Sequence, residues 1–176
     1  MFYRLILSNF DKKIILVLIP RVVSIFFVIF QVLGMVSYPG GTIHDLSTNG
    51  YSFTSNFFSD MGAYQARNGE PNYLSMIFFS ISLILVGGTF ALYYLVLPKV
   101  FGNNNRNYFL SWIGTIFAFS GSICLIGTGL TPTDLVFDSH VFFANNIFHS
   151  FLVTSFFYSI VIFDTNILEK RYAIGY

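Results

Sequence analysis

The chain has 176 residues, of which 55% are hydrophobic and only 10% are charged, whereas a soluble domain carries about 25% charged residues. This composition excludes an ordinary soluble fold and implies that much of the surface faces lipid. A net charge of +1 excludes the basic surface that a nucleic-acid partner requires. The single cysteine, Cys124, excludes an internal disulfide.

Four apolar segments are long enough to cross a membrane, which takes about 20 residues of helix. They cover residues 14–38, 73–97, 108–130 and 140–163, and glycine, proline or asparagine turns separate them. We therefore expect residues 1–176 to form a single all-α transmembrane helical bundle of about four spans. The chain has no Gly-rich phosphate loop, and we expect no cofactor.

The outer loop between the first two spans, residues 39–72, contains a stretch with helical periodicity. On a helix, Ser55, Asn56, Ser59 and Asp60 share one face, and the opposite face carries Phe53, Phe57, Phe58 and Met61. Gly62 then supplies a stop signal. We expect a short amphipathic helix lying at the outer membrane–water interface.

Basic residues predict the orientation, because short loops rich in Lys and Arg stay in the cytoplasm. With four spans, eight basic residues fall on one side and only Arg67 falls on the other. The eight are Arg4, Lys12, Lys13, Arg21, Lys99, Arg106, Lys170 and Arg171. We expect a cell-membrane protein with both termini cytoplasmic and the first span retained as an anchor.

Polar side chains occur inside the spans, where lipid offers no hydrogen bonds. His149 lies about 14 Å inside the fourth expected span and shares a helix face with Ser139, Phe142 and Asn146, so we expect this face to point into the bundle. The intramembrane polar layer predicted at this depth consists of His149, Asn146, Asn145, Gln31, Ser82 and Ser120. These groups either bond to one another and fix the helix register, or form a proton relay through His149 or a headgroup pocket that opens outward.

Small residues at four-residue spacing recur in two spans. The third carries Gly114, Ala118 and Ser122, and the second carries Gly87 and Ala91. Such ridges allow helices to approach closely in lipid. We interpret them as general helix packing rather than as a dedicated dimerisation face.

Carboxylates and imidazoles collect on the outer side. Asp60 either accepts hydrogen bonds from a neighbouring loop or is a solvated charge; alternatively it joins an acid–base or metal cluster drawn from three loops. The candidate catalytic residues are then Asp60, His140 and Asp134, and the candidate metal ligands are Asp60, Asp134, Asp138, His44 and His140. No diagnostic motif such as His-Glu-x-x-His accompanies them.

A series of short motifs suggests a family. Ser-Asp-Met-Gly at residues 59–62 precedes Gly-Glu-Pro-Asn at 69–72, and Gly-Thr-Gly-Leu-Thr-Pro-Thr-Asp at 127–134 precedes Ser-His at 139–140. Over residues 20–163 this order resembles the polytopic membrane proteins called the domain-of-unknown-function 998 family, and there is a fainter similarity to Frag1/DRAM/Sfk1-like proteins. The resemblance implies polar motif positions at Asp60, Asn72, Asp134 and His140. Proteins of that family usually have around six spans, so the resemblance leaves open whether residues 172–176 begin a further span of a longer protein.

Three functions remain open from these patterns. The first is a non-enzymatic multi-pass membrane protein that packs with membrane lipid, or with other membrane protein chains, through its bundle. The second is a membrane-embedded, metal-dependent lipid hydrolase with an outward-facing Asp/His site. The third is a small transporter or proton relay that uses His149. We favour the first, because no catalytic motif accompanies the candidate residues.

Overall fold

The computed structural model of the protein describes residues 9–176. Four helical segments of 27, 29, 26 and 28 residues are long and apolar enough to span a membrane. They cover Asp11–Ser37, Tyr73–Phe101, Asn105–Leu130 and Phe137–Asp164, close to the ranges expected from the sequence. The prediction of an all-α fold with four long apolar helices is confirmed.

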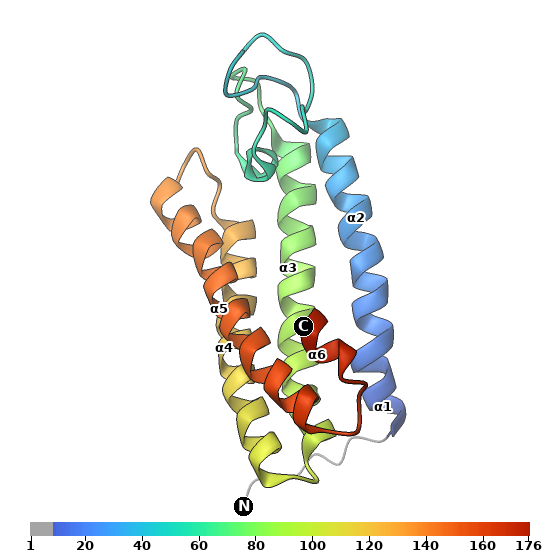
Figure 1. Cartoon of the computed structure of the whole chain (residues 1–176). Helices are drawn as coiled ribbons and strands as arrows, with labels where there is room; N and C mark the ends of the chain where they lie inside the picture. Colours follow the sequence, from blue (N-terminus) through green and yellow to red (C-terminus); the bar gives the residue numbers. More distant parts are fainter. Residues whose placement is uncertain (1–8) are drawn as a thin grey trace, which may run out of the picture.

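Short elements extend these segments or follow them (Figure 1). In chain order the elements are α1 (Asn9–Lys13), η1 (Ile14–Leu18), α2 (Ile19–Ser37), η2 (Phe58–Gly62), α3 (Tyr73–Val96), η3 (Leu97–Phe101), α4 (Asn105–Leu130), α5 (Phe137–Asp164) and α6 (Arg171–Gly175). The first segment therefore joins α1, η1 and α2, and the second joins α3 and η3.

A wide π-helical turn, η1, precedes Pro20 in the first segment. Proline has no N–H to donate to the preceding turn. Before it, the Ile19 N–H bonds to the Ile14 carbonyl five residues earlier, the spacing of a π-helix. The Ser24 hydroxyl donates to the Pro20 carbonyl at 2.8 Å. The segment thus stays helical through the proline.

The four segments pack in chain order and leave one side of the bundle open. α2 packs on α3, α3 on α4 and α4 on α5, but α2 and α5 have no extensive contact with each other. Figure 1 shows α6 turning back from the end of α5 toward α3, in the space between α5 and α2. The bundle is therefore a curved row of helices, with α2 and α5 at its two edges.

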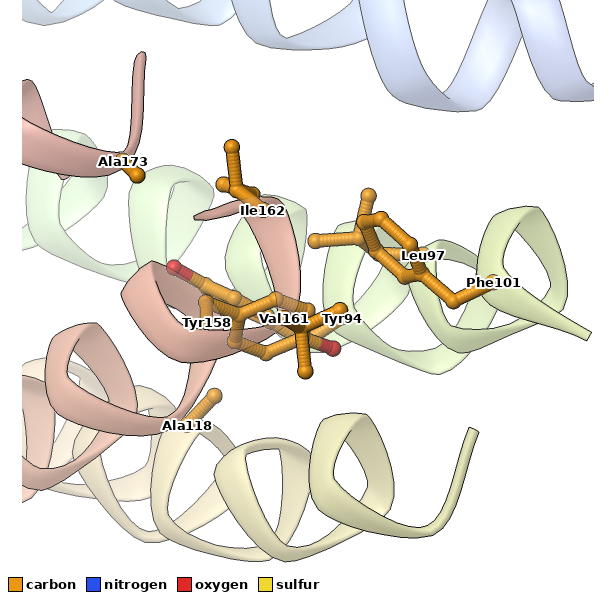
Figure 2. Close-up of a cluster of buried hydrophobic side chains, with 8 residues drawn as sticks. All are labelled: Tyr94, Leu97, Phe101, Ala118, Tyr158, Val161, Ile162 and Ala173. Atoms are coloured by element: carbon orange, nitrogen blue, oxygen red, sulfur yellow. The ribbon is translucent and has the colours of Figure 1, made fainter. Parts of the chain in front are cut away.

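A buried cluster near the α6 end joins α3, α4, α5 and α6 (Figure 2). Its members are Tyr94, Leu97, Phe101, Ala118, Tyr158, Val161, Ile162 and Ala173. Hydroxyl groups inside the cluster are paired: the Tyr158 and Thr115 hydroxyls lie 2.9 Å apart, and the Tyr176 hydroxyl donates to that of Tyr94 at 2.6 Å. The Tyr158–Thr115 bond joins α5 to α4, and the Tyr176–Tyr94 bond ties the residue after α6 to α3.

The amphipathic helix predicted in the outer loop does not form. The only helix between Ser37 and Tyr73 in the described chain is the five-residue 3-10 turn η2. The residues of the predicted apolar face do not share one environment, since Met61 is fully buried whereas Phe53 is 80% exposed. The loop instead folds around polar contacts and around Gly41, whose φ of +82° places it in the left-handed region that favours glycine.

Candidate functional site

Asp60 is buried in the outer loop and surrounded by hydrogen-bond donors. Arg67 donates to both carboxylate oxygens, from Nε to Oδ2 at 2.8 Å and from Nη2 to Oδ1 at 2.9 Å. Oδ2 also accepts from the Asn56 amide at 3.1 Å and from the Phe57 N–H at 2.9 Å. The hydrogen bonds to Asp60 raise the pKa of the Arg67 guanidinium. These contacts suit a carboxylate that holds the loop in shape.

Asn72 and Tyr38 extend this network to the ends of α3 and α2. The Asn72 amide donates to the carbonyls of Asp60, Met61 and Ala63 at 3.3, 3.1 and 2.9 Å. The Tyr38 hydroxyl accepts a hydrogen bond from the backbone N–H of Arg67 at 3.0 Å, and burial raises its pKa. The outer loop is thus a cap whose polar interior is tied to both helices.

Asp134 fastens the loop between α4 and α5 to this cap. Its two carboxylate oxygens accept the backbone N–H groups of Tyr64, at 2.7 Å, and of Gln65, at 2.9 Å. Nδ1 of buried His140, in the first turn of α5, lies 2.6 Å from the carbonyl of Thr131, the residue that follows α4. Both side chains therefore fix loops in position, as hydrogen-bonded carboxylates and imidazoles commonly do.

The metal cluster considered from the sequence does not form among the described residues. No group of three or more His, Cys, Asp or Glu residues within residues 9–176 is arranged to hold a metal ion. Asp60, Asp134 and His140 are each held by different partners, while His44 and Asp138 point into solvent as exposed side chains. The alternative in which Asp60, Asp134, Asp138, His44 and His140 form one metal cluster is therefore wrong for the described residues. Asp60, Asp134 and His140 instead bond to separate partners, as the alternative of a carboxylate that accepts hydrogen bonds expects for Asp60.

Only part of the polar layer predicted inside the membrane forms: Gln31 and Ser82 bond to each other, and Ser120 bonds to a serine outside the predicted set. Gln31 of α2 donates to Ser82 of α3, and Ser150 of α5 donates to Ser120 of α4 at 3.2 Å. His149 belongs to neither pair.

The prediction that the His149 face points into the bundle is wrong. His149 and Asn145 are exposed, and the Asn146 amide donates to the Phe142 carbonyl of its own helix at 2.7 Å. The physical reason is that α5 turns its aromatic stripe toward α4, where Gly121 lies against Phe151. His149, on the other face, is directed away from α4.

Two adjoining cavities lie between the edge helices α2 and α5. The first has a volume of about 370 Å³ and is lined almost entirely by apolar side chains, among them Phe27 and Val28 of α2, Val86 of α3 and Phe151 of α5. The second, of about 630 Å³, lies toward α6. The two share Pro20, Phe90 and Phe151, and we call them together the α2–α5 groove.

The first cavity has two polar lining residues, Ser24 and Thr89, and most of the polar groups of the groove line its α6 end. Those at the α6 end are Arg21 of α2, Tyr93 and Tyr94 of α3, Ser155 of α5 and Tyr176. Both volumes are within the range of about 300–1,000 Å³ typical of small-molecule sites. No sequence motif marked the groove. The available signal was Arg21, a charge that follows a proline inside an apolar segment.

Comparisons with known proteins find no protein family, no curated protein and no solved structure that matches this chain.

Proposed function

We propose that this protein is a non-enzymatic, multi-pass integral membrane protein that holds membrane lipid in the α2–α5 groove. The observation that carries the proposal is the open side of the bundle. There α2 and α5 flank an apolar cavity of about 370 Å³, and in a membrane this side would meet lipid tails. An acyl chain is the apolar ligand that such surroundings supply at high concentration.

The proposed orientation has the α6 end of the bundle in the cytoplasm, with both chain ends there. Support comes from the basic residues, of which only Arg67 belongs to the outer cap. Those at the opposite end within the described chain are Lys12, Lys13, Arg21, Lys99, Arg106, Lys170 and Arg171. Arg4 lies outside the described residues. An excess of Lys and Arg on one side is typical of the cytoplasmic face.

The hydrolase and the proton relay have less support than lipid holding. The hydrolase would need Asp60, Asp134 and His140 to converge on one substrate, and each has its own structural partner. The relay would need further polar groups beside His149, whose side chain is exposed on α5. The groove, in contrast, requires no rearrangement to accept an acyl chain.

A tryptophan placed in the groove tests the proposal. Val28 lines the cavity, and Val32, one helical turn further on, does not. Both side chains are more than half exposed, at 59% and 52%, so neither substitution disturbs the core. We expect purified Val28→Trp to retain fewer phospholipid molecules by native mass spectrometry, and Val32→Trp to retain the wild-type number, because only the first indole fills the groove.

Equal lipid retention by Val28→Trp, Val32→Trp and the wild-type protein would overturn the lipid-holding proposal. So would a native mass that shows a second protein chain bound to the wild-type protein in place of lipid, with lipid retention rising when that chain is removed.

A further inference from the structure

The inner end of the α2–α5 groove carries charge and hydroxyl groups that an acyl chain does not need. Given the lipid-holding function proposed above, we propose that this end binds the anionic phosphate headgroup of a lipid from the cytoplasmic leaflet. In this arrangement Arg21 is the cationic ligand, and the apolar part of the groove receives an acyl chain.

Arg21 lies at a membrane depth from which its side chain can reach a headgroup. It is 16 residues before Ser37, the last residue of α2, which is about 24 Å along a helix at 1.5 Å per residue. The hydrocarbon core is about 30 Å thick. With Ser37 at the outer boundary, Arg21 lies about 6 Å inside the inner boundary, a distance that an Arg side chain covers by extending toward the headgroups.

Arg21 is also available for an anion. Within residues 11–176 the ion pairs are Arg67 with Asp60, Arg106 with Asp164 and Arg171 with Glu169. Arg21 is in none of them, and its exposed side chain lines the cavity. A guanidinium without a carboxylate partner, at the edge of the hydrocarbon core, is stabilised by a phosphate group, which it can bind through two parallel hydrogen bonds.

The surroundings of Arg21 favour negative charge. At the α6 end of the bundle, seven basic residues accompany three acidic ones, Asp11, Asp164 and Glu169. Such an excess attracts anionic lipid headgroups. Tyr93 lines the same cavity, and its hydroxyl can donate to a phosphate oxygen.

Competition between two phospholipids with equal acyl chains tests the headgroup site. The full chain, in micelles containing phosphatidylglycerol and phosphatidylcholine in equal amounts, is examined by native mass spectrometry. We expect the wild-type protein to retain phosphatidylglycerol preferentially, and Arg21→Gln to lower this preference about fivefold. Arg21→Lys should keep most of it, and Arg171→Gln, which removes an exposed charge paired with Glu169, should keep nearly all of it.

The variants separate failure of this inference from failure of the lipid-holding function. Arg21→Gln is expected to change which lipid is retained, whereas Val28→Trp is expected to lower retention of both lipids. An unchanged preference in Arg21→Gln, together with a loss of both lipids in Val28→Trp, would overturn the headgroup site alone. Unchanged retention in Val28→Trp would overturn the groove itself, whatever the preference.

Discussion

Replacing Arg67 with methionine is expected to lower the free energy of unfolding by about 3 kcal/mol, at the low end of the cost of leaving one partner of a buried ion pair uncompensated. Asp60 keeps only 8% of its side chain exposed, and without Arg67 its carboxylate remains buried with two neutral donors. The low end applies because the Arg67 side chain is 33% exposed. Equilibrium unfolding by dodecyl sulfate in mixed micelles measures the change.

Arg106→Met is the matched control, because Arg106 pairs with Asp164 at 3.4 Å while 66% and 41% of the two side chains are exposed. An exposed pair of this kind contributes at most about 1 kcal/mol. The double variant Asp60→Asn, Arg67→Met should be more stable than Arg67→Met alone, because it no longer buries a charge. Equal effects of Arg67→Met and Arg106→Met would contradict the structural role assigned to Asp60.

Gly87→Ala is expected to destabilise the bundle by about 2 kcal/mol, the cost of overpacking a close helix contact. A Cβ atom at this position of α3 would lie 2.8 Å from the Ser122 carbonyl oxygen and 2.8 Å from Cγ1 of Ile126, both in α4. The Ser122 contact is with backbone, so the two helices must separate to relieve it. The expected result is a lower midpoint in the same mixed-micelle unfolding experiment.

The neighbouring glycine provides the control. A Cβ atom at Gly88 would have no heavy atom within 4 Å, and alanine has the higher helix propensity by about 1 kcal/mol. Gly88→Ala should therefore leave stability unchanged or raise it slightly. A loss of stability of the same size in both variants would show that the α3–α4 approach at Ser122 is not as close as described.

The four helices could be located from the sequence because a helix that spans lipid needs a continuous apolar stretch, a feature of local composition. The fold of the outer cap could not be predicted from local composition. It depends on Asp134 binding the backbone of Tyr64 and Gln65, some 70 positions earlier in the chain, and on Arg67 reaching back to Asp60. Helical periodicity between residues 53 and 61 contained none of this information.

The direction of His149 illustrates a second limit. Residue spacing shows which side chains share a face of α5, but the neighbouring helix decides which face is buried. Aromatic rings of α5 pack against three glycines of α4: Tyr158 against Gly114, Phe151 against Gly121, and Phe143 against Gly127. Small residues mark close helix contacts in membranes. Pairing the glycines of the third span with the aromatic residues of the fourth would therefore have predicted that His149 faces away from the third span.

The α2–α5 groove could not be predicted from any motif, since it results from an absent contact. Its apolar lining looks like ordinary span residues in the sequence, and only the lack of extensive packing between α2 and α5 leaves it open. Arg21 was counted as one of the basic residues that predict orientation. Its position beside a cavity also makes it a candidate ligand for a lipid phosphate.

Cysteine labelling in intact cells tests most directly the arrangement on which these proposals depend. In a Cys124→Ser background, Glu70→Cys places a thiol in the outer cap, and Asn103→Cys places one in the turn between η3 and α4, both at exposed positions. A membrane-impermeant maleimide is predicted to label Glu70→Cys at once and Asn103→Cys only after the membrane is opened. Immediate labelling of Asn103→Cys in intact cells would contradict the proposed orientation.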